Sequence, residues 1–304
     1  MTRAVVDVGS GSVLLTVARH DGEAWRFVDG TSEMTFLGEG AKQTGRLGEV
    51  PMVRTLAALR RAKERAGDAP LVAAATMAVR IAANRAEFLA RAAAQGTPLR
   101  VLSGEEEAAY GFRAVVEDPA FAALDTLSIV DPGGQSTELT VASRGPEGWQ
   151  VRFSRSYPLG TLGLRGGPLA DERPDLGAIM TATHLVDETI GTDIAPADAG
   201  TVVALGAPAT DLVTLREGLA DWRPDIVHGA WLDYEEVGKA VGWLMRMTDA
   251  ERQALPGMEP GRGRTIHAGC LILERFLNAL AAPGCRASVR GWRHALLMDD
   301  RAFG

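Results

Sequence analysis

Two acidic residues flank a glycine turn in the stretch IVDPGGQSTELTVA, residues 129–142. Asp131 and Glu138 are seven residues apart, so in a hairpin both side chains could face one ligand cleft. Carboxylate oxygens, completed by water molecules, are the ligands that Mg²⁺ prefers. The two acids are therefore candidate ligands of a divalent cation.

The turn between the acids could bind phosphate. Glycine has no Cβ, so successive backbone N–H groups can approach a single anion closely. The candidate residues are Gly133, Gly134, Gln135 and Ser136. Taken alone, such a turn is more simply an ordinary hairpin connection.

A similar stretch lies near the N-terminus, VVDVGSGSVLLTVA, residues 5–18. An offset of 124 residues pairs Asp7 with Asp131 and places Leu14 where the second copy has Glu138. Two copies favour ligand binding over a chance turn. The predicted phosphate-binding residues of the first copy are Gly9, Ser10, Gly11 and Ser12.

The two copies differ in their acids. Both turns would hold phosphate, but only the second carries the additional carboxylate, so the cleavage chemistry is expected to be asymmetric. Asp7 is a further candidate ligand of the metal or of the attacking water. The alternative for Asp7 is a hydrogen bond within its own turn.

The composition sets the class of protein. With 304 residues, 46% of them hydrophobic and 23% charged, the chain is predicted to be soluble, globular and long enough for two domains. No apolar run approaches the roughly 20 residues of a membrane span, and the N-terminus lacks the features of a signal peptide. Cys270 and Cys285 have no metal-ligand spacing, so we expect a cytoplasmic protein that does not bind a membrane.

The net charge limits the partners. A charge of −7 argues against nucleic-acid binding, which requires a positive field. A polyanionic ligand would have to be held locally, by backbone amides, arginines and a metal ion. The sequence does not settle the oligomeric state, and a homodimer is among the alternatives.

Strand and helix patterns alternate along the chain. Strands are predicted at 3–8, 13–19, 24–30, 71–76, 99–102, 126–131, 137–142, 149–160 and 200–206, and helices at 51–67, 83–96, 103–118, 233–247 and 264–280. Strands followed by helices, twice over, predict an α/β protein of two related domains facing one another across a cleft. We place the domains at 1–120 and 121–304, and the last helix could return to the first domain.

Several motifs resemble the Ppx/GppA phosphatase family, the exopolyphosphatases and guanosine pentaphosphate phosphohydrolases, in its short two-domain form. They follow the family order nearly end to end: the two hairpins, FLGEGAKQTGRL, ATMAVRIAANRAEF, VLSGEEEA, RSYPLGTLGLRGG, VHGAWLDYEEV and PGMEPGRGRTIHAGCLILERFL. The resemblance implies the actin-like (ribonuclease H-like) fold, in which two glycine turns grip a chain of phosphates. It also implies a Mg²⁺-dependent hydrolase that releases terminal phosphate from polyphosphate or guanosine pentaphosphate.

The resemblance also assigns roles to side chains. By motif position it places the general base at Glu106 in SGEEEA, metal and water ligands at Asp131 and Glu138, and a phosphate contact at Arg80 in TMAVR. A guanidinium group suits phosphate oxygens and stabilises developing charge.

The residues alone allow simpler interpretations. Ser103 and Glu106 have the spacing of a helix capping box, which would occupy the glutamate. Glu105 and Glu107 are predicted to be solvated neighbours. We expect His228 and His267 to be structural.

Some positions depart from the family pattern. Pro132 and Gln135 stand at the second hairpin where an apolar residue and a glycine are usual, and Pro208 interrupts a later glycine turn, ALGAPAT. Proline removes an N–H group, and Gln135 would be strained if the turn required a positive φ. These changes motivate an alternative hypothesis, a weak or inactive sensor that binds polyphosphate or an alarmone. An actin-like ATPase or sugar kinase is a third and weaker hypothesis.

Overall fold

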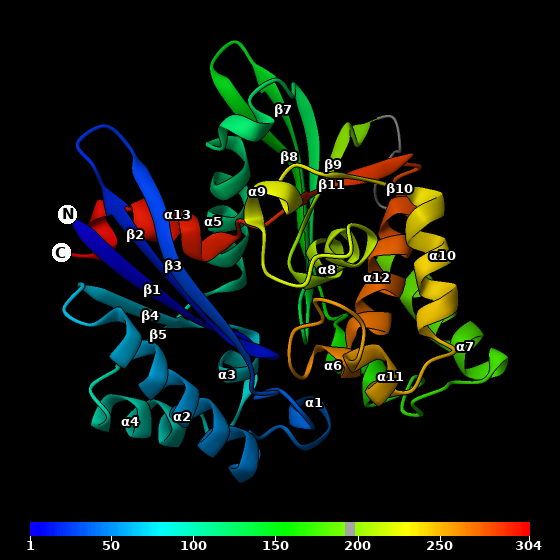
Figure 1. The fold of residues 1–304 in the computed structure, drawn as a ribbon, viewed down its shortest axis with the longest axis horizontal. Helices are drawn as coiled ribbons and strands as arrows, with labels where there is room; N and C mark the ends of the chain where they lie inside the picture. Colours follow the sequence, from blue (N-terminus) through cyan, green and yellow to red (C-terminus); the bar gives the residue numbers. More distant parts are fainter. Residues whose placement is uncertain (192–197) are drawn as a thin grey trace. The chain divides into compact units, whose positions relative to one another are not determined.

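The computed structural model describes residues 1–191 and 198–304, and its contacts divide the chain into two compact units (Figure 1). Unit 1 comprises Met1–Arg113 and Trp292–Gly304, and unit 2 comprises Ala114–Gly291. The chain first passes from unit 1 to unit 2 within helix α5, Gly104–Val116. The domain boundary expected near residue 120 stays a prediction.

Unit 1 is built on a five-stranded sheet with the order β3-β2-β1-β4-β5. Its strands are β1 (Thr2–Val8), β2 (Ser12–His20), β3 (Trp25–Met34), β4 (Leu71–Ala75) and β5 (Leu99–Val101). The first three strands form an antiparallel meander, and β4 and β5 extend it in parallel from β1.

Helices cover the sheet of unit 1 because β1 is apolar on both faces. Ala4, Val6 and Val8 belong to one buried cluster with α2, whereas Val5 belongs to another with α13. Glycines flank α2, and Gly67 after its last residue has φ +58°, as expected for a helix end. The helices are α1 (Ala41–Thr44), α2 (Glu49–Ala66), α3 (Met77–Ile81), α4 (Arg85–Ala94), α13 (Trp292–Met298) and the 3₁₀ turn η4 (Asp300–Ala302).

Unit 2 is built on a six-stranded sheet with the order β10-β11-β9-β6-β7-β8. Its strands are β6 (Thr126–Pro132), β7 (Thr137–Gly145), β8 (Gly148–Tyr157), β9 (Thr201–Leu205), β10 (Trp231–Asp233) and β11 (Gly284–Ser288). Strands β6, β7 and β8 form an antiparallel meander, and β9 and β11 extend it in parallel from β6.

The core of unit 2 centres on α12, Ile266–Ala279. Ile266, Cys270, Leu273 and Leu277 are buried, as the helical spacing of the sequence predicts. The other helical segments are η1 (Pro119–Phe121), α6 (Thr161–Arg165), α7 (Leu176–Ile190), α8 (Ala207–Arg216), α9 (Pro224–Val227), α10 (Tyr234–Leu244), α11 (Asp249–Gln253) and η3 (Arg262–Arg264). Within the described ranges, none of the helices is both long and apolar enough to cross a membrane.

The two sheets repeat one another in detail. Each sheet begins with a three-stranded antiparallel meander. The first strand of each meander, β1 or β6, also pairs in parallel with β4 or β9. The pairing shifts register between Val17 and Ala18 in β2, and between Val141 and Ala142 in β7. These sites are separated by 124 residues, the same offset that aligns the two hairpins (141 − 17 = 124). The duplicated hairpin of the sequence therefore belongs to a duplicated α/β sheet, and the predicted α/β class is confirmed.

Candidate active site

The first glycine turn joins β1 to β2. Its Gly9 N–H donates to the carbonyl of Ser12 at 2.9 Å and closes the turn. The chain after β3 returns to this turn: the N–H groups of Thr35 and Phe36 donate to the Gly11 carbonyl, and that of Gly38 donates to the Ser10 carbonyl at 2.8 Å. Among the described residues, the N–H groups of Ser10 and Gly11 donate to no backbone carbonyl.

The second glycine turn joins β6 to β7 and has the same closing bond, from Gly133 N–H to the Ser136 carbonyl at 2.8 Å. Gln135 and Ser136 are almost fully buried. No non-glycine residue of this turn has a positive φ. The turn therefore does not require a left-handed conformation at position 135, and the strain that such a conformation would cause does not arise.

The strand pairing brings Asp131 and Glu138 together. They are direct cross-strand neighbours in β6 and β7, so their side chains lie on the same face of the sheet. The equivalent pair in the first hairpin is Asp7 and Leu14. Only the second hairpin therefore carries two adjacent carboxylates.

The surroundings of this pair favour a polar ligand. Glu138 Oε1 accepts a hydrogen bond from Ser156 Oγ on β8 at 2.7 Å. Gly206, between β9 and α8, has φ +74°, and a Cβ there would lie 3.2 Å from Asp131 Oδ1. Glycine is thus required at position 206 by its conformation and leaves space beside the carboxylate.

The carboxylate pair fits a divalent cation. Mg²⁺ is commonly held by one or two carboxylates together with water and substrate phosphates, so two acids suffice. Within the described ranges, no three His, Cys, Asp or Glu side chains form a group that could hold a metal ion. The donor set therefore matches a cation shared with a phosphate substrate better than a structural metal enclosed by protein.

Asp7 occupies an unusual environment in unit 1. Its side chain is buried, and Oδ1 accepts no hydrogen bond from any described residue. Burial raises the pKa of Asp7 to about 7, against the opposing charge of Arg293 on α13. The alternative of a hydrogen bond within its own turn is not seen for Oδ1. The unpartnered oxygen keeps Asp7 available for a metal or water ligand.

Glu106 serves the start of α5. Its Oε2 accepts a hydrogen bond from the Ser103 N–H at 2.9 Å, and the Glu106 N–H donates to Ser103 Oγ at 3.1 Å. This is the capping box that the sequence allows. Its Oε1 is paired with Arg100 on β5. The Ser103 N–H, together with Arg100, holds the pKa of Glu106 below its usual value, which makes this carboxylate a weaker base.

Glu107, the next residue on α5, has a more enclosed environment. Its side chain is only 12% exposed, and Oε2 lies 3.5 Å from Arg80 Nη1. Arg80 at the end of α3 also donates to the Leu102 carbonyl at 2.7 Å. The prediction that Glu107 is a solvated neighbour was wrong, whereas Glu105 is exposed as expected.

The sequence contained a signal for this difference. A residue at the third position of a capping box turns its side chain back towards the cap, so the next residue points elsewhere. The capping pattern alone therefore favoured Glu107 over Glu106 for a role other than capping the helix.

The two histidines have structural surroundings. His228 Nε2 lies 3.0 Å from Asp118 Oδ2, which also pairs with Arg290 at 3.2 Å. His267 on α12 is fully buried, and neither of its ring nitrogens has a hydrogen-bond partner among the described residues.

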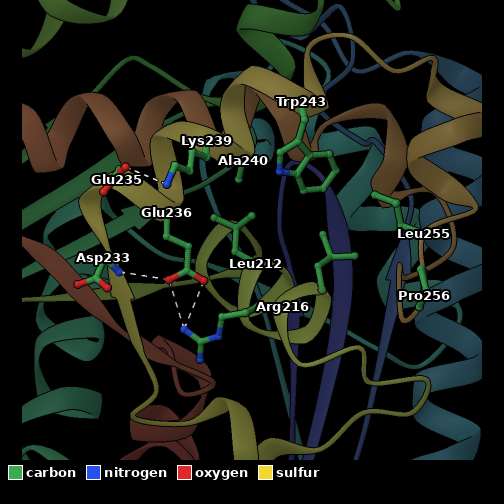
Figure 2. Close-up of a pocket in the computed structure, with 11 residues that line it drawn as sticks. Leu212, Arg216, Asp233, Glu235, Glu236, Lys239, Ala240, Trp243, Leu255 and Pro256 are labelled. Carbon is green, nitrogen blue, oxygen red and sulfur yellow. Dashed lines mark hydrogen bonds and ion pairs between the residues drawn. The ribbon is translucent and has the colours of Figure 1, made fainter.

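A pocket of about 650 Å³ in unit 2 lies apart from these residues (Figure 2). Leu212, Trp243 and Leu255 provide apolar walls, and its charged residues are paired with one another, as in Arg216 with Glu236. None of the predicted site residues lines this pocket. The predicted site residues lie instead on the hairpin of unit 1, on the hairpin of unit 2, on α3 and on α5.

Comparison with known proteins gives the family. A model of the Ppx/GppA phosphatase family matches residues 16–302. The chain belongs to this family. The resemblance stated from the sequence is thus confirmed, and the chain is a hydrolytic enzyme of the phosphatase class.

Curated relatives and solved structures of this family match nearly the whole chain. Exopolyphosphatase 2 of Mycobacterium tuberculosis is 28% identical over 301 residues, covering 91% of this chain and 90% of that protein. Exopolyphosphatase 1 of Mycobacterium bovis is 27% identical over 320 residues, covering 100% and 90%. The crystal structure of the Aquifex aeolicus family member has a TM-score of 0.79 at 27% identity and covers 98% of this chain and 96% of that one. That of an exopolyphosphatase-like protein has a TM-score of 0.89 at 26% identity, with 98% of each chain covered. The two-domain actin-like fold class is confirmed.

Proposed function

We propose that the chain is an exopolyphosphatase, a phosphoanhydride hydrolase that releases terminal phosphate from inorganic polyphosphate. The observation that carries the proposal is the Asp131 and Glu138 pair beside a glycine turn, which occurs in only one of the two repeated hairpins. A chain that only bound phosphate would not need this difference. Family membership and relatives named exopolyphosphatases support the same substrate class.

In unit 2, the residues Asp131 and Glu138 would hold a Mg²⁺ ion or another divalent cation. Such an ion neutralises phosphoryl charge and orients water when bound. The backbone amides of residues 134–136 in the second turn would bind phosphoryl oxygens, whereas the Gly133 N–H closes the turn itself. Those of residues 10–12 in the first turn would do the same in unit 1, where Asp7 is a further candidate ligand.

The reaction requires a water molecule, a base and positive charge. Water oxygen bonds to the terminal phosphorus, the phosphoanhydride P–O bond breaks, and the shortened chain leaves with its bridging oxygen. We assign the base to Glu107 rather than Glu106, because Glu106 is occupied by the helix cap and by Arg100. Glu107 would take the proton of the water, and Arg80 would stabilise charge on the phosphoryl group.

Guanosine pentaphosphate contains the same terminal anhydride, and we propose it as a second substrate. The inactive sensor is less well supported, because its premise included strain at Gln135 that the turn does not have. A cytoplasmic location and a homodimer stay predictions.

The test is phosphate release from a panel of long polyphosphate, tripolyphosphate, guanosine pentaphosphate and ATP, each with Mg²⁺ and with a chelator. We expect Mg²⁺-dependent turnover of polyphosphate that exceeds that of ATP. Tight polyphosphate binding without turnover would instead support the sensor. ATP turnover stimulated by a sugar would support the kinase alternative.

A further inference from the structure

The chain that follows β8 folds back onto the second glycine turn. The N–H of Thr161, the first residue of α6, donates to the Gly133 carbonyl at 3.0 Å, and the N–H of Leu162 donates to the Gly134 carbonyl at 2.8 Å. Thr137 Oγ1 adds a bond to the Leu159 carbonyl at 2.8 Å. The turn is therefore tied to the start of α6 through its own carbonyl groups.

These ties orient the amide groups of the turn. In a planar trans peptide, the C=O and N–H groups point in opposite directions. Because the carbonyls of Gly133 and Gly134 point towards α6, the N–H groups of Gly134 and Gln135 point away from it. Neighbouring N–H groups directed to one side form an anion-binding concavity.

The first turn is held in the same way. Its Ser10 and Gly11 carbonyls accept hydrogen bonds from residues 35–38, the segment that follows β3. By the same geometry, the N–H groups of Gly11 and Ser12 point away from that segment. The duplication thus includes the hydrogen bonds that orient the backbone amides of each turn.

Gly160 is the point of closest approach in the second copy. A Cβ at this position would lie 2.4 Å from both Gly134 C and Gln135 N, the two atoms of one peptide bond. Its φ of −154° is ordinary extended backbone, so the contact alone requires glycine. The added Cβ would displace the Gly134–Gln135 peptide bond, whose N–H points away from α6 and towards the proposed phosphate ligand.

We propose that Gly160 is a positioning residue, which fixes the Gly134–Gln135 peptide in the orientation that binds a phosphoryl group. This inference rests on the proposed function, because it assigns the ligand of the oriented amides as phosphate. Substitution by a larger residue would rotate or shift this peptide and weaken the grip on the polyphosphate chain without touching the acids.

The experiment compares Gly160→Ala with Gly163→Ala, a position within α6 where an added Cβ would have no heavy atom within 4 Å. A second variant, Thr161→Pro, deletes the N–H that donates to Gly133. Proline is tolerated at the first position of a helix, and Gly160 already has the extended conformation that a residue before proline adopts. KM and kcat for polyphosphate, and its affinity by calorimetry, are measured for all four proteins.

We expect Gly160→Ala to raise KM and the dissociation constant at least about tenfold, with a smaller change in kcat. Thr161→Pro should act in the same direction, and Gly163→Ala should match the wild type. Partial unfolding would give the opposite pattern, since it lowers the active fraction, and so kcat, while leaving KM unchanged.

Wild-type KM in Gly160→Ala would overturn the inference and leave the proposed function intact. A kcat loss at constant KM would also overturn it. A wild-type protein that neither binds nor cleaves polyphosphate would remove the proposed function, and this inference with it.

Discussion

Glu106 and Glu107 are adjacent in the sequence, yet their environments differ in kind. Glu106 accepts hydrogen bonds from the helix start and from Arg100, which lower its pKa and therefore its basicity. Glu107 is largely buried beside Arg80. By motif position the resemblance placed the base at Glu106, whereas we propose Glu107, because a one-residue difference in position decides which face of α5 a side chain occupies.

We predict that Glu107→Gln lowers kcat for polyphosphate by about 100-fold or more, the usual contribution of a general base. Glu106→Gln should stay within about threefold, because glutamine also completes a capping box. Steady-state phosphate release from the two variants checks this. An inactive Glu106→Gln with an active Glu107→Gln would reverse the assignment.

The buried His267 leads to a separate prediction about the pH dependence of stability. Burial, and then the charges of Arg252 and Arg165, lower its pKa to about 3 from the usual 6.5. A lowered pKa in the folded state gives stability that is complete above pH 6.5 and is lost as the pH falls towards 3. Lowering the pH from 8 to 5 should reduce the free energy of unfolding by about 2 kcal/mol through this residue alone.

The check is urea unfolding of the wild type and of His267→Leu at both pH values. The wild type should lose about 2 kcal/mol more than the variant between pH 8 and pH 5. Parallel losses in the two proteins would show that His267 is protonated in the folded state or is not buried as described.

At the scale of elements, the turn between β9 and α8 brings a helix start next to the acid pair. Gly206 has a positive φ and lies beside Asp131, whereas Gly218, after the end of α8, has φ +61° and no heavy atom within 4 Å of an added Cβ. The two glycines therefore share a conformational requirement and differ in their neighbours.

Gly218→Ala should destabilise the fold by about 1 kcal/mol because its φ is positive. Gly206→Ala should cost about 1–3 kcal/mol, since φ +74° with ψ 179° is a conformation that only glycine adopts readily. Only Gly206→Ala should also lower kcat, by about tenfold, because it displaces the Asp131 carboxylate. Thermal unfolding and phosphate release, measured together, separate the two effects. Equal activity in both variants would show that Asp131 does not depend on this contact.

Sequence patterns predicted several of the long elements, although not the helix α7, Leu176–Ile190. The apolar period of α12 and the glycine at the end of α2 are local signals, and both are seen in the structure. Strand β11, Gly284–Ser288, was not predicted, because five residues with a glycine, a cysteine and an arginine carry no clear alternation. The hydrogen bonds from Thr161 and Leu162 to the second turn could not be predicted either, because they join segments distant in the sequence.

For the molecule as a whole, the main feature is a sheet motif that occurs twice, with an additional carboxylate in the second copy. The meander, the register shift and the returning segment occur in both units. Glu138 occurs in only one, where Leu14 is its counterpart. The repeated turns would bind phosphate, and the additional carboxylate of unit 2 would complete the pair that holds the divalent cation.

The most direct test of this account is to measure kcat and the dissociation constant for polyphosphate in Glu138→Gln with Mg²⁺ present. Because the variant keeps the glycine turns, we predict a dissociation constant within about threefold of the wild type and a kcat reduced at least about 100-fold. A Glu138→Gln protein that releases phosphate at the wild-type rate would contradict the account.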